Sequence, residues 1–280
     1  MAGEVEVVEF RVPVENNKTI FIWDIHASFT EAFIYEALWK VYSAFGALYL
    51  VKVCPNAAVA TPGFYAIVKF YSSAHASKAL KATDRQCLFQ NSPLKVKLST
   101  KQTPNFLFRG QSLSFAKCQD LANHYLGFNG WSTRIVTLKD ISKCADAGWS
   151  LDAGSQGELL KYGCVVELTF PQYGVTCRGV GVAEDVVDLE KGQEEKLWKR
   201  GKLMKWARNK AVVGAFEKVL LVVFGSGKVA VECRFNQEEV LPDDNVEGAI
   251  QVNDISWTDF EADVGEEEDL PWDFTVDLSH

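Results

Sequence analysis

The sequence predicts an α+β protein with two folded domains followed by an acidic tail, and three observations support this prediction. A strand, helix, strand pattern occurs twice within residues 18–99. After a polar, proline-containing stretch the pattern changes, and residues 112–235 show longer strands and a long helix. All 29 Lys and Arg precede residue 236, whereas residues 236–280 carry 15 Asp and Glu, so the body is +7 and the tail −15. We expect 236–280 to be disordered.

The elements of residues 18–99 follow from hydrophobic spacing. Residues 18–25 alternate as a strand does, and apolar residues at intervals of three and four predict a helix after Thr30. Strands are predicted over 48–53, 64–70 and 94–98, with a short alanine-rich helix over 73–82 between the last two. The order is βαββαβ, which predicts a ferredoxin-like sandwich with two helices on one face of a four-stranded sheet.

Alternation along the central strands divides their side chains between two faces of that sheet. Ile20, Ile22, Ala66, Val68 and Phe70 share the face that the helices cover. The uncovered face receives aromatic, apolar and basic side chains, and those predicted to contact nucleic acid are Phe21, Trp23, Lys52, Tyr65, Ile67, Lys69, Lys95 and Lys97. Exposed aromatics stack nucleic-acid bases, and lysines contact phosphates.

The aromatic pattern of these strands resembles the RNA-recognition motif. Residues 20–25 (IFIWDI) match its first signature, and residues 63–70 (GFYAIVKF) match its second less fully, because Ile67 stands where a second aromatic is usual. The resemblance implies that Phe21 and Tyr65 stack successive bases. The alternative is a sheet of this fold that another part of the protein or a protein partner covers.

The second half begins with helical spacing over residues 112–125. Strands are predicted over 134–138, 162–170 and 175–183, the last two joined as a hairpin at residues 171–174. A long helix is predicted over about 194–223 and a closing strand over 228–235. These elements predict an α+β domain with a curved antiparallel sheet beside a long helix.

Several segments of this half resemble, in order, the DNA-binding domain of the RAD52 family of single-strand annealing proteins. They are residues 118–135 (CQDLANHYLGFNGWSTRI), 164–168, 180–184 and 206–212. The resemblance implies a basic groove for single-stranded DNA, with contacts from Lys117, Phe128 and Lys218. Arg134, within the first matching segment, is also predicted to contact nucleic acid, and Trp131 is expected in the core. Glu217 and Leu221 replace basic residues of the family, which counts against family-like ring assembly and annealing.

A basic segment precedes the end of the long helix. Lys199, Arg200 and Lys202 lie between Trp198 and Trp206, which predicts either phosphate contacts or an ordinary solvated helix face. The same residues form a short nuclear-import pattern.

Motifs of catalysis and of cofactor binding are missing from the sequence. There is no phosphate-binding glycine loop and no nucleophile elbow, and the seven cysteines and four histidines are not spaced as metal ligands. No run of about 18 apolar residues predicts a membrane span. We therefore expect a binding protein with no cofactor, no metal and no membrane contact.

The order of the two domains and the tail resembles a family of proteins that carry this RAD52-like motif. It implies a homo-oligomeric protein of the nucleus, with nucleolar and cytoplasmic pools, that binds single-stranded and double-stranded DNA and RNA in the DNA damage response or recombinational repair. The acidic tail either competes for the basic surface or aids solubility. The alternative function is a protein-interaction scaffold that uses the exposed sheet and retains a vestigial DNA groove.

Overall fold

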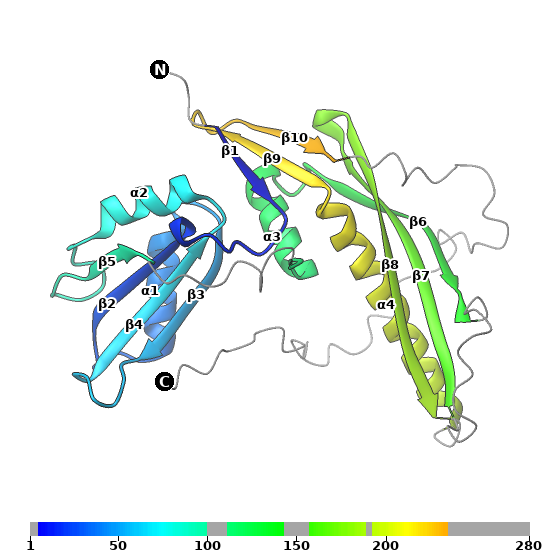
Figure 1. Ribbon diagram of the computed structural model, residues 1–280, viewed down its shortest axis with the longest axis horizontal. Helices are drawn as coiled ribbons and strands as arrows, with labels where there is room; N and C mark the ends of the chain where they lie inside the picture. The colour runs from blue at the N-terminus through cyan, green and yellow to red at the C-terminus, as the bar shows by residue number, and fades with distance from the viewer. Residues whose placement is uncertain (1–4, 100–110, 143–156, 189–191, 235–280) are drawn as a thin grey trace.

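Figure 1 shows the computed structural model of the chain, which describes residues 5–99, 111–142, 157–188 and 192–234. The predicted tail, 236–280, lies outside the described residues, as does most of the stretch between the two halves. The described chain forms three antiparallel sheets and four α-helices. This is the α+β class that the sequence predicts.

The first domain has the predicted βαββαβ order. It consists of β2 (Thr19–His26), α1 (Glu31–Ser43), β3 (Leu48–Pro55), β4 (Gly63–Phe70), α2 (Ser73–Thr83) and β5 (Lys95–Leu98). The strands pair antiparallel in the spatial order β3-β4-β2-β5. Both helices begin at a side-chain cap, because the hydroxyls of Thr30 and Ser72 accept hydrogen bonds from Phe33 N and His75 N.

The core of this domain confirms the predicted division of faces. The side chains of Ile20, Ile22, Ala66, Val68 and Phe70 are fully buried against the helices. The alternate residues of β2 and β4 are only partly buried, so the opposite face of the sheet is open.

The second domain is built on a second antiparallel sheet. It begins with α3 (Phe115–Leu126), continues with β6 (Ser132–Asp140), β7 (Gly157–Phe170) and β8 (Val175–Asp188), and then forms the long helix α4 (Gly192–Phe216). The spatial order is β6-β7-β8, and a short turn (Pro171–Tyr173), followed by Gly174 in the left-handed region (φ 62°), joins the last two strands as predicted. Helix α4 packs along one face of this sheet (Figure 1).

Two glycines of β8 allow α4 to approach closely. A Cβ atom at Gly179 would lie 2.1 Å from the carbonyl oxygen of Ala211, and one at Gly181 would lie 2.2 Å from that of Ala207. Both atoms belong to the helix backbone, so no side-chain movement relieves the clash. The two glycines therefore set the distance between helix and sheet.

The helix prediction for residues 194–223 is wrong at its end. Helix α4 ends at Phe216, and Val219–Phe224 forms a strand, β9, that pairs with β10 (Val229–Cys233). The apolar run of β9 fits a buried helix and a buried strand equally well by spacing alone. Its strand character depends on distant partners.

One of those partners lies at the start of the chain. Residues Val5–Glu9 form β1, which pairs antiparallel with β9 and gives the third sheet the order β1-β9-β10. This strand lies outside both predicted domain ranges, although it completes a sheet of the second half. The first domain is thus inserted between two parts of the second (Figure 1).

The two domains share a packed contact. Ala47 and Tyr71 of the first domain join one buried cluster with Cys118 and Leu121 of α3. The carboxylate of Glu6, on β1, accepts hydrogen bonds from residues 72 and 73 at the start of α2, including one of 2.6 Å from the Ser73 backbone N–H. These contacts fix β3 and α2 against the second domain.

Candidate nucleic-acid interface

The open face of the first sheet brings together eight of the predicted site residues. In the strand registers Phe21 lies opposite Ile67 and Lys97, Ile67 lies opposite Lys52, and Trp23 lies opposite Lys95. Tyr65 and Lys69 lie on either side of Ile67 along β4, on the same face. The alternation of the sequence was therefore sufficient to place this whole group.

Aromatic rings gather at the centre of the face. The ring centroid of Phe21 lies 5.3 Å from that of Tyr65 and 5.7 Å from that of Trp23. The ammonium nitrogen of Lys97 lies 5.8 Å from the Phe21 centroid and 5.2 Å from the Trp23 centroid, which is cation–π distance. A flat π-system and a positive charge thus occur side by side on a solvent-facing sheet.

The phenol of Tyr65 is neutral at physiological pH. Partial burial, together with the neighbouring thiol of Cys54, raises its pKa above the ordinary tyrosine value. An uncharged ring next to lysines does not repel an incoming phosphate, so the residue suits base stacking.

A bulge in β2 shapes one end of the face, and the sequence pattern did not reveal it. The pairing of β2 with β4 shifts between Ile22 and Ile25, and Asp24 takes the left-handed region with φ 64°. Its carboxylate lies 2.8 Å from the ammonium nitrogen of Lys95. Lys95 is therefore partly neutralised, whereas Lys97 has no carboxylate partner within the described residues.

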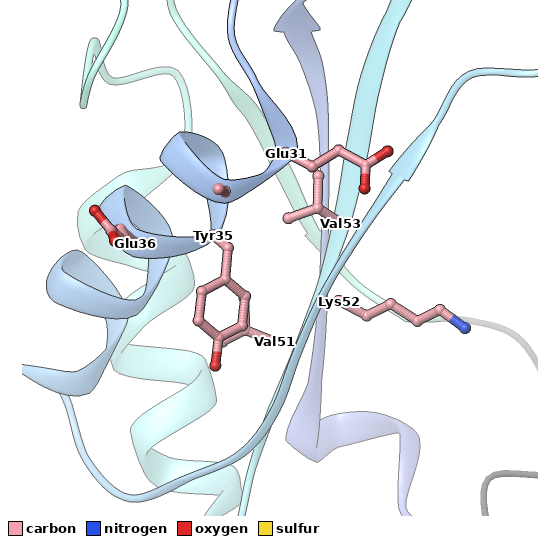
Figure 2. Close-up of a pocket in the computed structure, with 7 residues that line it drawn as sticks. Glu31, Tyr35, Glu36, Val51, Lys52 and Val53 are labelled. Carbon is pink, nitrogen blue, oxygen red and sulfur yellow. The ribbon is translucent and has the colours of Figure 1, made fainter. Parts of the chain in front are cut away.

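A shallow pocket lies on the other side of the same domain, between α1 and β3, and has a volume of about 440 Å³. Figure 2 shows the ring of Tyr35 over Val51 in this pocket, with Lys52 extending away from it. Glu31 and Glu36 are also part of the lining. Two carboxylates disfavour a polyanion, so the open sheet face is the better candidate for nucleic acid.

The turn after α3 places its two aromatic residues as expected. Phe128 is 84% exposed, whereas Trp131 packs against the core. The indole N–H of Trp131 donates to Asn123 Oδ1 at 2.9 Å, and its ring meets that of Phe216 edge to face at 5.3 Å. Phe128 is thus available for contact, and Trp131 holds the turn in place.

Arg134 lies on the outer face of the β6-β7-β8 sheet, where its charge is already paired. Its guanidinium donates to Glu167 Oε1 at 2.9 and 3.2 Å, and Arg178 donates to Glu167 Oε2 at 3.2 Å. Hydrogen bonds from Arg134 are the largest influence that holds the pKa of Glu167 below its usual value; burial opposes them, and Arg178 reinforces them. The two arginines therefore share one carboxylate partner within the protein.

The basic residues of α4 divide into two groups. Lys199 lies 3.5 Å from Asp185 and 3.7 Å from Glu195, and Arg200 interacts electrostatically with Asp140 and with Tyr162. Both therefore serve the contact between helix and sheet.

Lys202 belongs to the second group, the residues on the open side of α4. Its ammonium lies 4.8 Å from the ring centroid of Trp198 and 4.5 Å from that of Trp206. Trp198 is exposed, whereas Trp206 packs partly against the core, so Lys202 and Trp198 remain candidates for phosphate or base contact.

Lysines also protect the free edge of β8. Lys199 donates to the carbonyl of Val186, Lys210 to that of Val182 and Lys218 to that of Arg178. These carbonyls recur every four residues along the strand, and capping them blocks edge-to-edge pairing. Lys218 therefore has a structural role at the position where the resemblance implied a DNA contact.

Lys117 stands apart from the other predicted residues of the second half, because it lies at the junction of the domains. Its ammonium is 5.9 Å from the ring centroid of Tyr49, a residue of β3 that sequence reasoning did not select. Lys117 lies on α3, Phe128 on the turn after it, Arg134 on β6 and Lys202 on α4, so the predicted contacts of the second half come from different elements.

Within the described ranges, no group of three His, Cys, Asp or Glu side chains is placed to hold a metal ion. Among the helices that the structure describes, none is both long and apolar enough to cross a membrane.

The fold and the open face define the class of protein: a βαββαβ domain of RNA-recognition topology, inserted into an α+β domain with a long helix over its sheet. The model of the RDM1 DSRM domain family matches residues 113–220, within that second domain. The solved structure of the Mip6 RRM3 domain is 22% identical and covers 32% of this chain and 100% of its own, with a TM-score of 0.27.

Curated relatives extend the match to nearly the whole chain. RAD52 motif-containing protein 1 of Danio rerio is 63% identical over 99% of both chains. The proteins of the same name from Gallus gallus and Homo sapiens are 43% and 39% identical, over 97% and 94% of this chain and 95% and 93% of theirs. The chain belongs to the RAD52 motif-containing protein 1 family.

Proposed function

We propose that this chain is a non-enzymatic nucleic-acid-binding protein whose primary site is the open face of the β3-β4-β2-β5 sheet. The observation that carries the proposal is the cluster of Phe21, Tyr65 and Trp23 rings with Lys97 beside them. Each base stacked on such a ring contributes about 1 to 3 kcal/mol without any requirement for a particular base. Single-stranded DNA and RNA are therefore the proposed first ligands.

The second domain is proposed to add contacts to DNA, including duplex DNA. Phe128 is exposed at the turn after α3, and Lys202 lies between two tryptophans on α4. Tandem contacts raise the apparent affinity through effective concentration. The RAD52 motif in the name of the family supports a role in the DNA damage response or recombinational repair, which would require a nuclear pool of the protein.

The test is fluorescence anisotropy of the full chain with labelled single-stranded DNA, single-stranded RNA and duplex DNA over a salt series. The double variant Phe21→Ala, Tyr65→Ala should bind single strands at least about thirtyfold more weakly, because two stacking platforms are lost. The matched control is Tyr35→Ala, Trp39→Ala, which removes two exposed aromatics from α1 on the far side of the same domain.

The acidic tail gives the experiment a second arm. A chain that ends at Phe235 retains every described element, and it should bind more tightly at low salt if the tail competes with nucleic acid. Failure of the wild-type chain to bind any of the three probes at low salt would overturn the proposal and favour a protein-interaction scaffold.

Self-association is a separate part of the proposal. Because lysines cap the β8 edge, a homo-oligomer has to use another surface than an extended sheet at β8. Sedimentation velocity of the full chain with and without DNA measures the assembly. A single monomeric species across the concentration series would contradict it.

A further inference from the structure

We infer that Tyr49 extends the nucleic-acid site from the sheet of the first domain onto α3 of the second, so that one strand crosses both domains on a continuous surface. This inference rests on the proposed function and adds a route for the ligand. Tyr49 lies outside the RNA-recognition signatures, and Lys117 belongs to the proposed site because it lies beside Tyr49.

The position of Tyr49 follows from an irregularity in β3. The pairing of β3 with β4 shifts between Leu48 and Leu50, so Tyr49 is an extra residue that does not follow the alternation of the strand. Its ring meets the buried ring of Tyr71 edge to face, with centroids 5.8 Å apart. The bulge thus directs an aromatic ring toward the edge of the sheet that faces α3, and Tyr71 fixes its orientation.

Two lysines from two domains converge on this ring. The ammonium of Lys69, on the open face, lies 5.7 Å from the Tyr49 centroid, and that of Lys117, on α3, lies 5.9 Å from it. A phosphate beside the Tyr49 ring would therefore be attracted to a cation from each domain, which suits a nucleic-acid backbone.

Tyr49 and its two lysines lie at the end of a row of residues that follows β4 along the open face. Tyr65, Ile67 and Lys69 alternate along β4, and each step of two residues advances about 6.8 Å. A strand that stacks on Tyr65 and Phe21 and follows β4 therefore reaches Lys69, and then the ring of Tyr49. Lys117 is the next cation along this path.

The contact between the two domains holds Lys117 at a fixed position relative to the sheet of the first domain. Tyr71 and Ala47 are buried in the same cluster as Cys118, the neighbour of Lys117. The hydrogen bonds from residues 72 and 73 to Glu6 join the same region to β1. Lys117 therefore stays close to the sheet, and binding does not have to fix the two domains against each other.

The test compares two lengths of labelled single-stranded DNA, four and twelve nucleotides, on the full chain. Four nucleotides suffice for the stacking face, because a sheet of this type stacks two or three bases. Lys117→Gln should weaken the twelve-nucleotide probe several-fold, reduce its salt slope by about 0.7, and leave the four-nucleotide probe within about twofold. Tyr49→Leu should show the same dependence on length.

Matched variants separate this outcome from others. Lys40→Gln removes an equal charge from the exposed surface of α1 and should affect neither probe, and Lys117→Arg should restore the long probe. Equal effects of Lys117→Gln and Lys40→Gln, or equal effects of Lys117→Gln on both lengths, would overturn the inference while leaving the sheet site intact. Failure of the wild-type chain to bind either probe would instead refute the proposed function.

Discussion

Two of the described sheet faces, that of β3-β4-β2-β5 and the outer face of β6-β7-β8, carry basic residues whose charges are differently paired. On the first, Lys97 and Lys52 have no carboxylate partner within the described residues, and two aromatic rings lie beside Lys97. On the outer face of β6-β7-β8, Arg134 and Arg178 share Glu167, and Lys161 lies 2.9 Å from Glu184. A count of basic residues therefore does not by itself predict a polyanion site, because a cation that is already paired with a carboxylate attracts a phosphate less strongly.

The largest expected effect concerns the fold that supports the second face. Gly181→Ala places a Cβ against the backbone of α4, which should cost about 3 kcal/mol and lower the melting temperature by roughly 10 °C. Gly214→Ala is the matched control on the opposite side of the same contact, where a Cβ would lie 3.4 Å from the Val180 carbonyl oxygen.

Hydrogen exchange localises this damage. Protection should fall in β7, β8 and α4 and persist in β2 and β4, since the first domain has a buried core of its own. Equal loss of protection in both domains would show that their stabilities are not separate.

Two lysines of β5, one paired with a carboxylate and one not, test whether such pairing weakens phosphate contact. Lys97→Ala should weaken single-stranded DNA binding about fivefold at low salt and reduce the salt slope by about 0.7. Lys95→Ala should have a smaller effect on both, because Asp24 already offsets the Lys95 charge. Anisotropy titrations at four salt concentrations measure both slopes, and indistinguishable slopes would show that pairing with Asp24 does not govern phosphate contact.

A smaller effect is expected when the second face is made to resemble the first. Glu167→Gln removes the carboxylate that neutralises two arginines, so duplex DNA should bind about threefold more tightly at low salt. Arg134→Gln alone should change binding less than twofold, and adding it to Glu167→Gln should reverse the gain. Unchanged affinity in Glu167→Gln would mean that nucleic acid does not approach this face.

The sequence predicted the first face and its eight residues because strand alternation is a local signal. Ile20 and Ile22 are buried and Phe21 is not, as the spacing required. The bulges at Asp24 and Tyr49 were not predictable, because each depends on the register with a neighbouring strand. The first bulge brings Asp24 to Lys95, and the second determines where the ring of Tyr49 lies.

The second half was predicted less well, and the reason is distance along the chain. The pairing of Arg134 with Glu167 joins two strands, and the strand character of Val219–Phe224 depends on β1 and β10. A single-sequence pattern carries neither fact. Gly179 and Gly181 gave a visible signal, two glycines in a strand, whose meaning appears only when α4 lies against them.

The pairing of β1 with β9 also sets an order of events during synthesis. Residues 5–9 precede the inserted domain along the chain, whereas their partners, residues 220–224, follow that domain and most of the second one. The strands of the inserted domain all lie within residues 19–98. This domain can therefore fold before β9, the pairing partner of β1, has been synthesised. The β1-β9-β10 sheet can therefore form only after the inserted domain has been synthesised, and until then β1 lacks the strand partner that it has in the folded protein.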